Sequence, residues 1–281
     1  MTPTHPTFAT TSSPTVAFRA AAAMAWREII RFVRQRNRVV GAIGQPILFW
    51  LLFGVGMKSS FRMSGMDFSE YFIPGTVVLI LLFTAIFATI SIIEDRQEGF
   101  LQSVLVAPLP RWTFVLGKVA GGSLLAVSQA LMFLILTVAA GYHVSIFNGL
   151  IAILMMIVVA IGLTCLGFCL AWRLDSTQGF HAIMSLLLMP MWLLSGAFFP
   201  IAPMTADASL GQKLLSIVMR CNPVTYAVAG LRGLFGEARN NAMDVWTPSP
   251  LLCWVITVVF ATVMFYLSVR STRRTTQGDL Q

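Results

Sequence analysis

Long apolar runs without charge recur along the chain and dominate its pattern of polar and apolar positions. A helix needs about 20 mostly apolar residues to cross the roughly 30 Å hydrocarbon core of a membrane. Residues 119–172 contain no Asp, Glu, Lys or Arg and are long enough for two crossings, which divide naturally near Gly141-Tyr142-His143 and Asn148-Gly149. Four further runs each fit one crossing: 39–57, 71–93, 180–201 and 251–269. The pattern therefore predicts an all-α polytopic membrane protein with six transmembrane helices within residues 39–270.

The segment before the first apolar run has a different, amphipathic pattern. Within residues 16–38, apolar side chains that include Trp26 and Ile29 recur at helical spacing, and four arginines recur on another face. Apolar and basic faces on one helix are typical of a helix that lies in the membrane interface. We therefore expect an amphipathic interface helix over 16–38, because its apolar stripe argues against the alternative of a solvated basic linker. Residues 1–15 are rich in Thr, Pro and Ser, and we expect a disordered cytoplasmic tail.

Residues 202–250 hold two apolar stretches that are too short to span a membrane. They cover 209–220 and 223–236. Pro223 stands between them, and a proline at this point interrupts a continuous helix. We expect two short re-entrant helices before the last crossing, which dip into or lie on one membrane face. Residues 271–281 would then form a cytoplasmic C-terminal tail.

Composition and charge agree with a membrane protein. Of the 281 residues, 57% are hydrophobic and 11% are charged, whereas soluble domains carry about 25% charged residues. This excludes an ordinary soluble domain, a disordered chain and a disulfide scaffold. If the N-terminus is cytoplasmic, six crossings place 13 of the 19 basic residues on the inner side. The positive-inside rule then supports cytoplasmic termini and accounts for the net charge of +8 without nucleic acid.

The apolar runs carry no Asp or Glu in their middles. Carriers driven by protons or sodium usually keep ionisable groups there, because the coupling ion needs ligands. Lys118 stands at an inner end, where we expect its side chain to reach the interface. Val119 follows Gly117-Lys118, so this pair is not a G-x-x-x-x-G-K-[ST] phosphate loop. The scattered cysteines and histidines lack metal-ligand spacing, so we expect no metal site.

The loop after the second predicted crossing has a distinctive order of residues. It reads EDRQEGFLQSVLVAPLPRWTFVLGK over 94–118. Charges cluster at its start, Gly99 follows, and Pro108 and Pro110 precede Arg111. This order predicts a short helix, a bend and a rigid return into the membrane. A plain solvated loop is the alternative.

Three segments together resemble the type-2 permeases of ATP-binding-cassette (ABC) exporters. They are EDRQEGFLQSVLVAPLPR at 94–111, LLSGAFFPIAPM at 193–204 and CNPVTYAVAGLRGLFG at 221–236. Their order within a six-span layout carries the resemblance, which covers roughly residues 20–270. By this resemblance, the ATPase-coupling contacts are Glu94, Arg96, Glu98, Gly99, Pro108 and Arg111. The substrate path would include Phe83, Phe87, Met184, Met191 and Phe198, and the outer gate Asn222, Pro223 and Arg232.

The resemblance also implies a function. The chain would be the permease subunit of an exporter that moves an amphiphilic cargo, such as a drug, lipid or lipid-linked glycan, outward. A separate ATPase, present in two copies, would bind ATP and Mg²⁺, so this chain would hold no cofactor and would not itself be an enzyme. A second permease copy would complete a homodimer in the inner membrane of a prokaryote. Small residues at Gly117, Gly121, Gly122 and Ser123 are a candidate dimer contact.

Three other function classes stay open at the level of sequence. An ATP-independent secondary carrier or channel would be favoured by buried ionisable residues. A membrane enzyme would be favoured by clustered His, Asp or Glu at one membrane face, but His5, His143 and His181 are scattered. A scaffold subunit without a transport role is the third.

Overall fold

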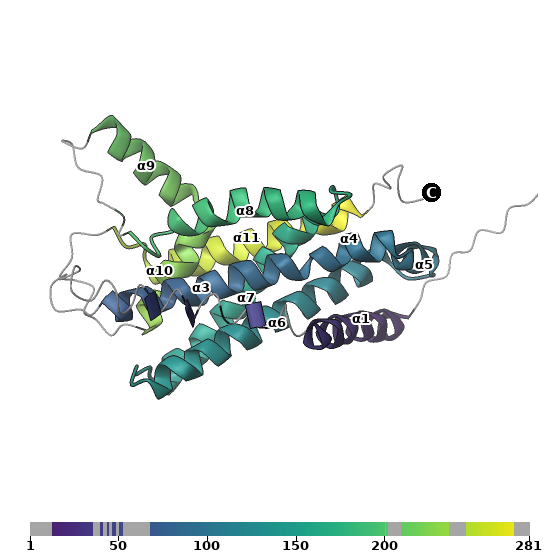
Figure 1. Ribbon diagram of the computed structural model, residues 1–281, viewed down its shortest axis with the longest axis horizontal. Coiled ribbons are helices and arrows are strands. Elements are labelled where there is room, and N and C mark those ends of the chain that lie inside the picture. Colours follow the sequence, from purple (N-terminus) through teal and green to yellow (C-terminus); the bar gives the residue numbers. More distant parts are fainter. Residues whose placement is uncertain are drawn as a thin grey trace, which may run out of the picture.

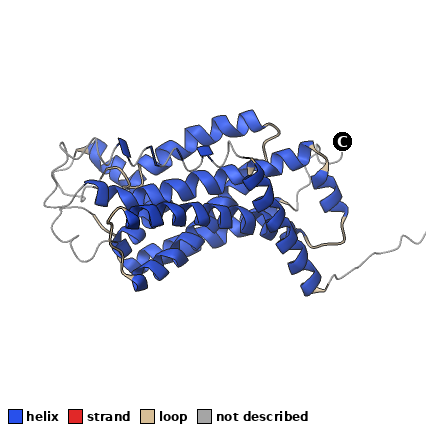
Figure 2. Cartoon of the chain, turned by 60° about the horizontal axis from the view of Figure 1, so that its bottom comes forward, coloured by secondary structure: helices blue, strands red, loops and turns tan. Residues whose placement is uncertain are grey.

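The computed structural model describes residues 13–35, a few positions between 40 and 52, 68–199, 201, 209–235 and 246–272. These parts are helical and contain no strand (Figure 2). Most of the predicted crossing over 39–57 and most of both predicted tails lie outside them. The helices are α1 (Pro14–Arg34), α3 (Phe68–Ala88), α4 (Ile90–Gln97), α5 (Phe100–Val106), α6 (Arg111–Ala139), α7 (Ile146–Ala171), α8 (Thr177–Leu193), α9 (Leu210–Cys221), α10 (Pro223–Phe235) and α11 (Pro250–Ser271).

Four helical stretches are long and apolar enough to cross a membrane. The turn between α6 and α7 contains Gly141 with a φ of 100°, where the sequence predicted a division. Helices α9 and α10 meet at 77° and would count as a fifth crossing if they form one broken span. The structure therefore supports four or five crossings, and six stays a prediction. The four stretches are Tyr71–Gln97, which joins α3 to α4, Arg111–Ala139, Ile146–Ala171 and Pro250–Ser271.

The predicted crossing over 180–201 takes the form of a shorter helix. Helix α8 has 17 residues, which corresponds to about 25 Å and is at the short end of what spans a membrane. A turn follows in which Gly196 adopts a φ of 76°. The Tyr71 hydroxyl at the start of α3 donates a hydrogen bond to the Gly196 carbonyl oxygen at 3.0 Å. The apolar run thus contains a helix followed by a fixed turn. Hydrophobicity alone does not distinguish this arrangement from one continuous helix.

Helix α3 lies at the centre of the bundle. Helices α6, α7 and α10 pack around it (Figure 1). Its most apolar stretch is 83% buried, whereas that of α11 is only 22% buried. Helix α11 packs mainly on α7 and α10 and leaves much of its apolar surface uncovered. A broad uncovered apolar surface is typical of contact with lipid or with another protein.

Small residues on α6 let α1 and α7 approach closely. A Cβ atom on Gly117 would lie 2.7 Å from the Met24 Cβ, and one on Gly121 would lie 2.9 Å from the Glu28 Cβ. Gly122 faces α7 in the same way. Close helix approach at small residues is common in membranes, but here the contacts form within one chain. The prediction that these residues form a dimer contact is therefore wrong, because α1 and α7 already cover them.

Helix α1 uses two different faces. One face packs on α6 through buried residues that include Ala17, Ala21 and Phe32. Phe18, Trp26 and Val33 of the predicted apolar stripe are largely exposed, with Trp26 at 62%, although the Phe18 ring also contacts the Trp112 ring of α6. This leaves the stripe free to contact a membrane, while its location in the interface stays a prediction.

Different helices lie at the two ends of the bundle. Helices α1, α4 and α5 lie at one end, together with the last turn of α11, and α9, α10 and the start of α3 lie at the other (Figure 1). At the first end, the Arg111 side chain donates a hydrogen bond to the Thr272 carbonyl oxygen and joins the start of α6 to the end of α11. Helix α1 and the end of α11 therefore lie at the same end, as the expected topology requires.

Candidate functional site

Residues 94–111, which we term the coupling segment, form a bend between two membrane-crossing stretches. Gly99 adopts a φ of 75° between α4 and α5, a left-handed backbone that costs other residues energy. Pro110 precedes α6 with extended backbone angles. Prolines cannot continue a helix and restrict the residue before them. The short helix, bend and return have the shape that the sequence predicted from Gly99, Pro108 and Pro110.

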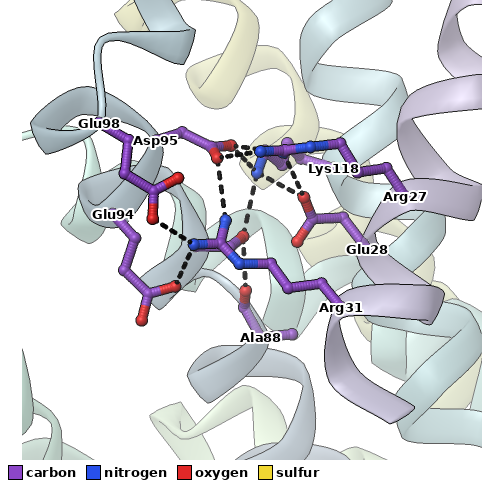
Figure 3. A network of polar contacts seen from close by, with 9 residues as sticks. Arg27, Glu28, Arg31, Ala88, Glu94, Asp95, Glu98 and Lys118 are labelled. Carbon is purple, nitrogen blue, oxygen red and sulfur yellow. Dashed lines mark hydrogen bonds and ion pairs between the residues drawn. The ribbon is translucent and has the colours of Figure 1, made fainter. Parts of the chain in front are cut away.

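Asp95 of α4 lies at the centre of a set of charges between α4 and α1 (Figure 3). Its side chain is fully buried, at 0% exposure. Arg27 donates to both carboxylate oxygens at 2.9 and 3.2 Å, and Arg31 donates at 2.9 Å. Lys118 Nζ also donates to Asp95 Oδ2. A buried carboxylate must be paired and hydrogen-bonded, and Asp95 meets that requirement with three cations. In return, the hydrogen bond to Asp95 raises the pKa of Arg27.

Lys118 of α6 is buried rather than extended towards the interface. It is 4% exposed, and its ammonium group donates to Glu28 Oε1 at 2.7 Å, to Ser91 Oγ at 3.0 Å and to Asp95. All three N–H groups are thus used. The prediction that this side chain reaches the interface is wrong, because α1 packs over α6 and brings Glu28 against it.

Arg31 extends the same set of charges to the surface. Its guanidinium group forms ion pairs with Glu94 at 3.0 Å and with Glu98 at 3.1 Å (Figure 3). Helix α1 and Lys118 of α6 therefore both hold α4, and they share the Asp95 carboxylate. We term the complete set the charge network: Arg27, Glu28, Arg31, Glu94, Asp95, Glu98 and Lys118.

Arg96 points away from the charge network and towards the end of α7. It donates to the carbonyl oxygens of Trp172 at 2.8 Å and Leu174 at 3.2 Å, and to Asp175 Oδ1 at 3.2 Å. A cation at the C-terminal end of a helix satisfies carbonyl groups that lack partners and complements the helix dipole. Arg96 thus fastens the coupling segment to the turn between α7 and α8.

One face of the coupling segment stays uncovered. Gln102, Ser103 and Pro108 are exposed, and Val106 is 85% exposed. A large apolar side chain in such a position, within a polar surface, is typical of a protein contact. Of the predicted coupling residues, Glu94 and Arg96 are partly buried and mainly used within the chain. Glu98, Pro108 and Arg111 are exposed, and Arg111 also contacts Thr272.

The predicted path residues form two groups along α3 and α8. Phe83 and Phe87 pack together with ring centroids 5.7 Å apart, and Phe87 lies 5.3 Å from the ring of His181. Met184 is buried and Met191 is partly buried. Phe198 packs separately, in the turn after α8, against Phe72, Trp192 and Phe199. Their role as a substrate path stays a prediction.

The predicted gate residues fasten α10 to its neighbours at the opposite end. Asn222 donates to the Met191 carbonyl oxygen at 2.6 Å and accepts from the Val224 N–H at 3.0 Å. Pro223 then starts α10. Arg232 donates to the Gly196 carbonyl oxygen at 2.9 Å and lies 4.0 Å from the centre of the Tyr71 ring. The short helices were predicted correctly, and their position in a membrane stays a prediction.

Sequence reasoning did not select Glu28, Asp95 or Val106 as site residues. Glu28 is an isolated acid within a basic helix, between Arg27 and Arg31. This isolated position is the feature of the sequence that could have identified it as a site residue. Asp95 stood among the charges of the loop, but its central place depends on contacts with α1 and α6. Val106 is one of several apolar residues in α5, and only the fold shows which of them is exposed.

The fold and this site define a polytopic helical membrane protein with a braced coupling segment at one end. The sequence model of the family "ABC-2 type transporter" matches residues 19–235, and the chain belongs to this family. It is 27% identical over 217 residues to ycf38 of Cyanophora paradoxa, whose name describes a transport permease, with 75% of this chain and 72% of that protein covered. It is 30% identical over 142 residues to YbhR of Escherichia coli K12, whose name describes a multidrug ABC transporter permease, with 50% of this chain and 38% of that protein covered.

Proposed function

We propose that the chain is the membrane-spanning permease subunit of an ABC exporter. It would move an amphiphilic cargo outward, driven by ATP hydrolysis in a separate ATPase that binds ATP and Mg²⁺. Two such ATPase subunits and a second copy of this chain would complete the complex in the inner membrane of a prokaryote, with both termini cytoplasmic. Membership of the ABC-2 family supports this proposal.

The proposal depends on one observation: the coupling segment is fixed to the rest of the bundle on one side and exposed to solvent on the other. The charge network and Arg96 connect the segment to α1, α6 and α7. Gln102, Ser103 and Val106 on the other side are exposed. A surface that docks a partner and passes on its motion needs both properties, because a loose loop would absorb the displacement.

The mechanism would be a shift between two arrangements of the helices. Binding of ATP would close the ATPase pair, displace the docked α5 and thereby favour one arrangement of the permease pair. A ligand shifts such an equilibrium only by the difference between its affinities for the two states. Movement of α5 would reach α6 through Lys118 and the end of α7 through Arg96, so both crossings would respond together.

The cargo would be amphiphilic because the predicted path is apolar. Phe83, Phe87, Met184 and Met191 provide aromatic and thioether surfaces, and methionine adapts to varied shapes. The multidrug role in the name of YbhR agrees with such a cargo.

Purification from native membrane without crosslinker tests the proposal. We expect a stoichiometric partner that contains G-x-x-x-x-G-K-[ST], and ATP hydrolysis by the complex that depends on that partner. A chain that purifies alone, without an associated ATPase, would contradict the proposal.

A secondary carrier is the second candidate, since the structure does contain buried ionisable residues. Glu28, Asp95 and Lys118 are 6%, 0% and 4% exposed. They lie at the α1 end of the bundle rather than at its middle, and they pair with one another, which favours a bracing role. Gradient-driven uptake by vesicles that contain only this chain, without ATP, would support the carrier, and Asp95→Asn should then abolish it.

A further inference from the structure

An open groove of about 500 Å³ runs along α1 and is bordered by Glu98 of the coupling segment. This volume is within the range of roughly 300–1,000 Å³ that small-molecule sites occupy. Three arginines line the groove, Arg27, Arg31 and Arg34, together with Trp26, Ile30 and Glu98. Guanidinium groups bind phosphate through paired hydrogen bonds, and the indole and isoleucine side chains add an apolar wall.

Arg34 provides the uncompensated charge of this groove. Arg27 and Arg31 are already bonded to Asp95, and Arg31 also pairs with Glu94 and Glu98. Arg34 is exposed, and the described structure gives it no hydrogen-bond or ion-pair partner. An anion that enters the groove would therefore be held first by Arg34 and would share Arg31 with Glu98.

The position of the groove indicates what kind of anion it would bind. Trp26 belongs both to the groove and to the exposed apolar stripe with Phe18 and Val33. A helix that lies in the interface buries such a stripe by about 5–10 Å, which leaves its flanking basic residues at the level of the lipid headgroups. Clusters of basic residues at this depth attract anionic lipids.

We propose that the groove binds the headgroup of an anionic phospholipid, with Arg34 as its main anchor. The proposal rests on the membrane location in the proposed function but not on an ATPase partner. The headgroup phosphate would compete with Glu98 for Arg31, whose bond to Glu98 is 3.1 Å long and lies at the surface (Figure 3). Exposed ion pairs contribute little energy, so the lipid would loosen the link between α1 and the coupling segment. The charge of the inner leaflet would thus regulate how firmly that segment is held.

Native mass spectrometry of the purified full chain in detergent tests this inference. The probes are dilauroyl phosphatidylglycerol and dilauroyl phosphatidylcholine at equal concentration, without any ATPase. We expect preferential retention of phosphatidylglycerol, which falls roughly fivefold in Arg34→Gln because one basic residue contributes on the order of this factor. Arg19→Gln removes an exposed arginine of the same helix that does not line the groove, and should leave retention unchanged.

Glu98→Gln should change the retention of phosphatidylglycerol in the opposite direction to Arg34→Gln. Removing the competing carboxylate should increase retention of phosphatidylglycerol, whereas general damage to the fold would decrease it. Equal retention of the two lipids, or equal losses in Arg34→Gln and Arg19→Gln, would overturn the proposal. Full displacement of the lipid by millimolar inorganic phosphate would also overturn it, because the site would then be a plain anion site.

Discussion

Asp95 of α4 and Lys118 of α6 form a buried ion pair, and α1 covers them with Glu28 and Arg27. The two residues are far from α1 in sequence, yet a single helix connects to both. Burying charges is favourable only if each finds partners, so α1 must dock for this pair to be stable. Moving α1 away from the coupling segment would therefore cost free energy, because it would leave the buried charges of Asp95 and Lys118 with fewer partners.

The first prediction concerns Lys118→Met. The change leaves Glu28 with only its 3.5 Å contact to Arg27, and loss of one partner from a buried pair costs about 3–5 kcal/mol. We expect a clear decrease in the unfolding temperature in detergent micelles. Adding Glu28→Gln should restore part of it, because no uncompensated carboxylate is then left. Arg19→Met, at an exposed position of α1, should have little effect.

The second prediction concerns the backbone of Gly99. Nothing lies within 4 Å of the Cβ that a substitution would add, so the left-handed φ of 75° sets the cost. Gly99→Ala should destabilise the protein by about 1–2 kcal/mol, and Gly99→Asn should destabilise it less, since asparagine tolerates this conformation better. Chemical unfolding curves of both variants check the order. Equal free energies of unfolding for Gly99→Ala and the parent protein would contradict a left-handed backbone at residue 99.

The third prediction concerns the close approach of α1 to α6. A Cβ on Gly121 would lie 2.9 Å from the Glu28 Cβ and 3.1 Å from the Ala25 carbonyl oxygen. Gly121→Ala should therefore push α1 outward and cost about 1–3 kcal/mol. Gly211→Ala on α9 meets nothing within 4 Å and should be neutral or slightly stabilising. Comparable losses in the two variants would contradict the tight packing of α1.

The fourth prediction concerns Arg96→Lys. A lysine keeps the charge but loses the planar fork that reaches both the Trp172 and Leu174 carbonyl oxygens. Amide exchange in a peptide that covers the α7–α8 turn should accelerate by roughly fivefold or more, which corresponds to about 1 kcal/mol. Arg173→Lys, at an exposed neighbouring position, is the matched control. Similar exchange in both variants would mean that Arg96 does not fasten this turn.

The sequence predicted well the features that depend on local chemistry. The apolar runs located the described crossings, Gly141 marked the turn between α6 and α7, and Pro223 marked the bend between α9 and α10. Gly99 and the prolines of the coupling segment act within a few residues of their own backbone. Their effects can therefore be inferred without a partner.

The features that the sequence did not reveal depend on contacts between distant elements. Lys118 directly precedes a long run without charge, as a side chain that reaches the interface from a helix end would. Its burial follows from Glu28, 90 residues earlier, which approaches because Gly117 and Gly121 admit α1. The same glycines were assigned to a dimer contact, since a sequence does not show which helix uses a small-residue face.

The central claim, that the exposed face of α5 docks a separate ATPase, is tested most directly by Val106→Asp. Val106 is 85% exposed, so the substitution should leave the fold and the unfolding temperature unchanged. His143→Asp places the same charge at an exposed position between α6 and α7, and these two helices meet at the end of the bundle away from α5 (Figure 1). Co-purification from native membrane should show at least a tenfold loss of the ATPase in Val106→Asp and full retention in His143→Asp. Equal retention of the ATPase in both variants would contradict the claim.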